Sequence, residues 1–199
     1  RRIDPPAGLE ERAEPRLAPA PETPQIGERR FEIRRDANPA LLIGYHKPTV
    51  PERADAVAEV VSILLSEGRT SRLYRSLVLE KQLASSVGAS TGPGDKYPNL
   101  LIIRATPRAP HTVSEVETAI YGEVERLGRE GPAEHELQRV KNMLDADLQR
   151  SLRSNAGLAS ALAHYMALTR DPFFLETYIE RLKSVNAAEV RDFVKTYLG

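Results

Sequence analysis

The chain has no cysteine among its 199 residues, so it forms no disulfide and offers no thiolate for catalysis or metal binding. It also lacks any run of about 18 apolar residues, the length that a bilayer-spanning helix needs. Neither sign of charge is in excess, because 28 Lys and Arg residues balance 28 Asp and Glu residues. This balance argues against a nucleic-acid binder and against attraction to an anionic membrane surface.

The first residues also lack an initiator Met and the apolar core of a signal peptide. We therefore expect this chain to be a fragment of a longer polypeptide. Residues 1–30 hold six of the fifteen prolines, with mixed charge and few large apolar side chains. Such a segment buries too little surface to offset the entropy of ordering it. We expect an extended linker between domains over residues 1–30 and a folded domain over residues 31–199.

Strand patterns follow the linker. The sequence predicts strands over 31–35 and 40–46, with a turn between them at 36–39. Residues 40–46 are an almost continuous apolar run, which predicts a central strand covered on both faces. Two further strands are expected over 84–91 and 99–106, and Leu101 and Ile103, or their neighbours, should pack against helices.

Helical patterns occupy the rest of the chain. Apolar residues recur at helical spacing over 54–65, and Thr112 and Glu115 have the spacing of a capping box at the start of another helix. A third helix should follow Gly131 and Pro132, and two more should begin at Asp171-Pro172 and at Asn186. This order favours an α+β fold, with helices packed on one face of a mixed, mainly antiparallel sheet and a helical C-terminal portion.

The four histidines do not form a zinc motif. His135 and Glu136 begin a pattern like H-E-x-x-H, but Arg139 stands where the second histidine is needed. In the inverted order, H-x-x-E-H, Gly131 stands at the first histidine position. We therefore expect His135 to be an exposed residue in the first turn of a helix, and we assign no catalytic and no metal-binding residue to this chain.

The other polar residues also form no recognisable catalytic motif. His46 is expected to be a half-buried structural residue at a strand end, and His111 and His164 to lie in a turn and on a helix. Ser85 and Ser86 have no base near them in sequence, and no nucleophile elbow or phosphate-binding loop is present. Asp145 and Asp147 should point in different directions from one helix.

A more specific signal lies in residues 68–87, which read GRTSRLYRSLVLEKQLASSV. This segment resembles the C-terminal homologous domain of the pitrilysin/insulinase-type zinc peptidases. The strand LIGY near residue 43 and the helix start Gly131…Glu134-x-Glu136-Leu137 contribute to the same resemblance. The resemblance covers almost the whole chain. It implies a non-catalytic domain that carries no cofactor of its own, with zinc held by an N-terminal homologous domain of the same polypeptide or by a partner.

Many members of that family have the segment Leu-Arg-Glu-Lys-x-x-Leu-x-Tyr, whose Arg and Tyr contact the substrate backbone. With Leu77 and Leu83 at the two leucine positions, Val78 stands at the Arg position and Ser85 at the Tyr position. In two-chain bacterial members one chain carries zinc and the other carries Arg and Tyr, so the resemblance implies a homologous partner chain and a peptide substrate. The alternative is a structural or assembly module without proteolytic function. The compartment stays open between the bacterial cell envelope or periplasm and the cytoplasm.

Overall fold

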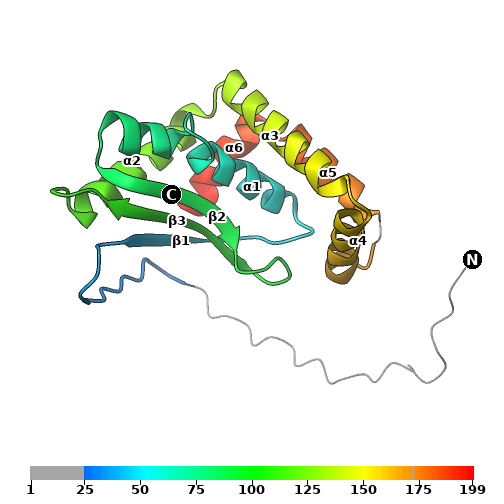
Figure 1. The fold of residues 1–199 in the computed structure, drawn as a ribbon, viewed down its shortest axis with the longest axis horizontal. Helices are drawn as coiled ribbons and strands as arrows, with labels where there is room; N and C mark the ends of the chain where they lie inside the picture. Colours follow the sequence, from blue (N-terminus) through cyan, green and yellow to red (C-terminus); the bar gives the residue numbers. More distant parts are fainter. Residues whose placement is uncertain (1–24, 172) are drawn as a thin grey trace, which may run out of the picture. The chain divides into compact units, whose positions relative to one another are not determined.

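The computed structural model describes residues 25–171 and 173–199 (Figure 1). The chain divides into two units, Arg1–Asp36 and Ala37–Gly199. Most of the expected linker and Pro172, at an expected helix start, lie outside the described residues. None of the described helices is long and apolar enough to cross a membrane.

In the first unit, the strand predicted over 31–35 is wrong. These residues have no strand assignment, and the side chains of Phe31 and Ile33 are 85% and 78% exposed. Arg34 Nε lies 2.7 Å from an oxygen of Glu32, and both of these side chains are largely exposed. An alternating pattern predicts a strand only where another strand is available to pair with it, and the described part of the chain provides none here.

The second unit contains a three-stranded antiparallel sheet. Its strands are β1 (Leu41–Lys47), β2 (Ala84–Gly92) and β3 (Asn99–Pro107), in the order β1-β3-β2. The prediction that residues 40–46 form a central strand is therefore wrong, because β1 lies at an edge of this sheet. Its side chains alternate in exposure, and Leu42 is 62% exposed. The apolar run suggested a strand covered on both faces, but Leu42 lies on the face of the sheet that none of the described helices covers (Figure 1).

Helices cover the other face of the sheet, as predicted (Figure 1). The helical segments are α1 (Arg53–Ser66), η1 (Tyr74–Glu80), α2 (Val113–Glu130), α3 (Glu134–Leu152), α4 (Asn155–Thr169), α5 (Phe174–Ser184), α6 (Ala187–Phe193) and η2 (Val194–Leu198). The expected α+β fold with a helical C-terminal portion is confirmed.

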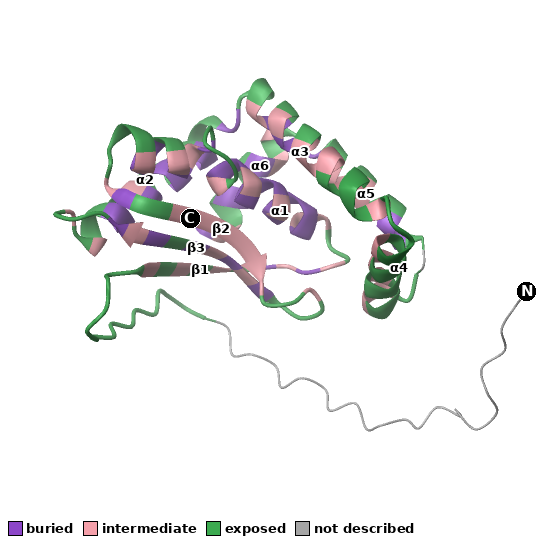
Figure 2. Ribbon diagram, in the orientation of Figure 1, coloured by how far each residue is buried: buried purple, intermediate pink, exposed green. Residues whose placement is uncertain are grey.

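The core lies between β3 and the helices (Figure 2). Leu101 and Ile103 are fully buried, as predicted, while their neighbours on β3 are less buried. On α1, the predicted stripe that includes Val61 and Leu64 is buried against them. Thr112 caps α2 in the predicted capping box, and Asn186 caps α6 in another. Capping and packing thus hold the sheet and the helices in one unit.

Candidate functional site

The two most distinctive sequence segments of the chain contact each other in the structure. Gly68 adopts a φ of +79°, which favours glycine, and the Ser71 hydroxyl donates to its carbonyl oxygen over 2.7 Å. Arg72 follows and donates to both carboxylate oxygens of Glu136, over 2.8 Å and 2.6 Å, and to the carbonyl oxygen of Gly131 over 2.9 Å. This bidentate pair joins the start of η1 to the start of α3.

The pair also sets the charge of Glu136. Burial works to raise the pKa of this carboxyl group, but the hydrogen bonds from Arg72 and from the backbone N–H of Ala133 outweigh it. The pKa of Glu136 is consequently lower than that of an ordinary glutamate, and the group stays ionised. The glycine, serine and arginine of the segment at 68–72 therefore have a structural function.

The helical segment after Arg72 ends in π-helical turns. The N–H of Lys81 donates to the carbonyl oxygen of Ser76 over 2.9 Å, and Gln82 has a φ of +52° that ends the helix. Val78, at the position of the family arginine, lies in these turns, is half-buried and packs against the core. Its side chain has no polar group that could contact a peptide.

Ser85, at the position of the family tyrosine, lies on a β-bulge at the start of β2. Ala84 pairs with Pro107 and Ser86 with Thr106, so Ser85 is the additional residue between them. Its side chain is exposed, and its hydroxyl donates to the carbonyl oxygen of Thr106 over 3.2 Å. Bulges of this kind turn a side chain out of the regular alternation, often next to functional sites.

The histidines lie apart from one another. His135 is exposed in the first turn of α3, as predicted, whereas His46 is exposed rather than half-buried as we had expected. His111 lies 3.5 Å from Glu115, and His164 on α4 lies 3.2 Å from Asp95 in the loop between β2 and β3.

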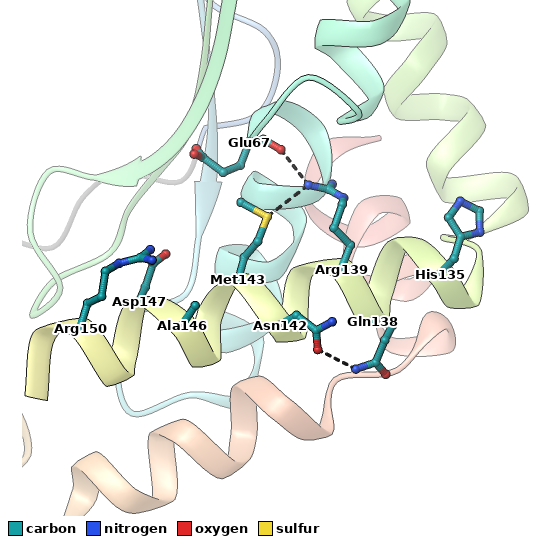
Figure 3. Close-up of a pocket in the computed structure, with 9 residues that line it drawn as sticks. All are labelled: Glu67, His135, Gln138, Arg139, Asn142, Met143, Ala146, Asp147 and Arg150. Atoms are coloured by element: carbon teal, nitrogen blue, oxygen red, sulfur yellow. Dashed lines mark hydrogen bonds and ion pairs between the residues drawn. The ribbon is translucent and has the colours of Figure 1, made fainter.

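A pocket of about 600 Å³ runs along α3 (Figure 3). Arg139 points across it, donating to the carbonyl oxygen of Glu67 over 2.8 Å and contacting the Met143 sulfur. Figure 3 places His135 at one end of the row of residues on α3 and Asp147 near the other. This pocket contains no second imidazole, so its residues do not match a zinc site.

A second group of polar residues lies around α1, and sequence reasoning missed it. Lys47 and Asp55 form an ion pair with side chains only 1% and 6% exposed, and the Tyr178 hydroxyl donates to Asp55 over 3.2 Å. One turn further along α1, Glu59 accepts a hydrogen bond from Thr91 over 3.0 Å. No motif predicts these contacts, because the partners come from β1, α1, β2 and α5.

Burial is the largest influence on Glu59 and raises the pKa of its carboxyl group. The nearby charges of Asp55 and Asp95 raise it further, while Thr91 and Lys47 work against the rise. A pocket of about 290 Å³ lies beside Glu59, lined also by Glu67 and Thr91.

These groups do not fit a catalytic zinc centre. Within residues 25–171 and 173–199, no three His, Asp or Glu side chains lie close enough together to hold a metal ion. A catalytic zinc needs three such ligands and an open position for water. Asp145 and Asp147 serve separate contacts, as predicted, with Lys183 and with Arg150.

The strands and helices described above define an α+β domain, and its described residues present no side-chain set that fits a catalytic zinc. Residues 5–144 match the family model described as the peptidase M16 inactive domain. The chain belongs to this family, which confirms the resemblance inferred from residues 68–87. No curated protein matches the chain.

Solved structures agree with this fold. A protease from Helicobacter pylori matches with a TM-score of 0.73 and 21% identity, over 80% of this chain and 38% of that one. The inactive peptidase domain of a candidate zinc protease from Bordetella parapertussis matches with a TM-score of 0.70 and 20% identity, over 83% of this chain and 88% of that one. A chain of complex III from Candida albicans matches with a TM-score of 0.66 and 17% identity, over 79% and 39%. The chain thus spans well under half of the Helicobacter pylori protease.

Proposed function

We propose that this chain acts as the C-terminal, non-catalytic half of a zinc metallopeptidase-type protein. It closes a chamber around an extended peptide and helps to bind that peptide, while the zinc motif is carried by an N-terminal homologous domain or by a partner chain. The observation that carries the proposal is the match of residues 5–144 to the peptidase M16 inactive domain. The lack of a fitting metal-ligand set in the described residues agrees with it.

The proposed peptide contact is the surface formed by the end of η1 and the start of β2. Support comes from the exposed Ser85 bulge, which presents its side chain outward, and from its nearness in sequence to Val78. Neither residue offers what an Arg and Tyr pair would provide, because valine donates no hydrogen bond and serine is short. We therefore propose that a homologous partner chain supplies the Arg and the Tyr.

The experiment is peptide cleavage by the polypeptide that carries this domain, with zinc present, alone and mixed with a homologue that keeps Leu-Arg-Glu-Lys-x-x-Leu-x-Tyr. Loss of a donor near a developing oxyanion typically costs about 10²–10³ in rate, so the chain alone should be almost inactive and the mixture active. Full activity of the chain alone, unchanged by the partner, would refute the division of labour.

A structural or assembly module is the second candidate. The observation that favours it is the match to a chain of complex III from Candida albicans. The same experiment separates the two functions. If the mixture cleaves peptide equally well when this domain is omitted, while a larger complex fails to assemble without it, the assembly function is correct.

A further inference from the structure

The two edges of the three-stranded sheet differ in how they are protected. At the outer edge of β2, the Ser66 hydroxyl accepts from the N–H of Ala89 over 2.6 Å and lies 3.3 Å from its carbonyl oxygen. One side chain from the end of α1 thus occupies both backbone groups that an added strand would need at Ala89. The bulge at Ser85 interrupts the same edge nearer its start. Both features are known means of preventing strand addition.

The register of the sheet shows which backbone groups of β1 face outward. Because the backbone groups of Ala89 point away from β3, its partner Ile103 must direct its own groups toward β1, where it pairs with Ile43. Pairing alternates along an antiparallel ladder, so the N–H and C=O groups of Leu42 and Gly44 point to the outer edge of β1. In the part of the chain that the structure describes, no strand pairs with that edge.

The side chains along this edge form a projection and a gap. Leu42 is 62% exposed on the uncovered face of the sheet. Gly44, two residues further on and on the same face, is exposed and has no side chain. A Cβ atom at Gly44 would lie 3.2 Å from Leu100, so Leu100 forms one wall of the gap.

We propose that the β1 edge binds a second copy of this chain by antiparallel strand addition. Leu42 of each copy pairs with Gly44 of the other, and the two Ile43 residues meet at the twofold axis. Both Leu42–Gly44 pairs are of the hydrogen-bonded type, so the contact makes four backbone hydrogen bonds and joins two sheets into one of six strands.

The match is self-complementary, which is the requirement for a symmetric dimer. Each leucine covers the bare glycine of the other copy and contacts Leu100 beside it. No like charges oppose each other across these pairs, so the register carries no electrostatic penalty. Leu42 and Gly44 are two residues apart on the same strand, so a second copy of β1 places a leucine opposite each glycine. We therefore infer that the occupant of this edge is the chain itself.

The test is sedimentation of the 199-residue chain over a range of concentrations. We expect a reversible dimer, and we expect Leu42→Lys to weaken it by a factor of about ten or more, because the new charge and lost leucine act at both pairs. The matched control is Leu79→Lys, which removes an exposed leucine of η1 (42% exposed) away from the edge and should leave the dimer unchanged. Circular dichroism checks that both variants fold.

Cross-linking gives an independent readout, because the chain has no cysteine of its own. Hydrogen-bonded antiparallel neighbours have Cα atoms about 5.5 Å apart, which suits a disulfide. Differently tagged Leu42→Cys and Gly44→Cys chains should therefore form a mixed disulfide on mild oxidation, whereas Leu42→Cys with Ser86→Cys on β2 should not. A chain that stays monomeric up to about 0.5 mM, or a dimer that Leu42→Lys leaves intact, would overturn the proposal.

Discussion

Replacing Arg72 with alanine should destabilise the fold more than the loss of any exposed ion pair. The side chains of Arg72 and Glu136 are only 11% and 17% exposed, and the substitution removes three hydrogen bonds at once. It leaves the Glu136 carboxylate partly desolvated without its cation and the Gly131 carbonyl oxygen without this donor. Breaking a buried ion pair costs about 3–5 kcal/mol, and the residual exposure here lowers the expected loss to about 2–4 kcal/mol.

The matched control is Arg75→Ala, one turn further along the same segment. Arg75 pairs with Glu80 over 2.7 Å, but these side chains are 68% and 52% exposed. Exposed pairs contribute about 0–1 kcal/mol because water screens them. Urea unfolding followed by circular dichroism at neutral pH compares the two variants. If Arg72→Ala loses no more stability than Arg75→Ala, the Arg72–Glu136 pair does not hold η1 to α3 as we infer.

The pH dependence supplies a second readout of the same pair. Because the pKa of Glu136 is lower in the folded state, its contribution to stability is fully present above the ordinary pKa of a glutamate. That contribution is lost as the pH falls through the lowered pKa. Arg72→Ala removes the cause of the shift, so the stability difference between wild type and variant should shrink on acidification. A difference that stays constant down to low pH would contradict this.

Other predictions concern buried and charged groups. Burial raises the pKa of Glu59 in the folded state, so the stability of the fold should decrease as the pH rises from the ordinary pKa of a glutamate through the raised pKa. Glu59→Gln should abolish this decrease, and the variant should unfold at a higher urea concentration than wild type at neutral pH. Leu101→Ala and Ile103→Ala should each cost about 2–5 kcal/mol in urea unfolding, with a much smaller loss for Leu100→Ala on the uncovered face. Losses below about 1 kcal/mol at both Leu101 and Ile103 would mean that the sheet face is misassigned. The isolated chain should bind no stoichiometric zinc in equilibrium dialysis, and tight binding that His135→Ala abolishes would show that a ligand set was missed.

Sequence patterns predicted the interior of this fold well. The burial of Leu101 and Ile103 on β3 and the helix caps at Thr112 and Asn186 agree with what the sequence predicts. These features depend on near neighbours in the sequence or on the alternation of a single strand. Both are visible in one sequence.

Features that depend on which segments are available to pair were predicted poorly. Residues 31–35 have a strand pattern but pair with nothing in the described chain, and β1 has a buried-strand composition but lies at an edge. The Lys47–Asp55 pair and the contact of Ser66 with Ala89 join separate elements at unrelated spacings. The composition of one strand does not determine its position within a sheet, and contacts between distant segments have no fixed spacing in the sequence.

The surroundings of Val78 and Ser85 give the two positions unequal evolutionary freedom. Ser85 lies on a bulge with its side chain exposed, so a tyrosine could be introduced there by substitution without repacking the core. Val78 packs against the core within a π-helical turn, where an arginine would have to bring a charge into apolar surroundings. An arginine at position 78 would therefore be harder to introduce than a tyrosine at position 85. A protein with valine at position 78 would therefore continue to depend on a partner for the arginine contact, even while position 85 stayed free to change.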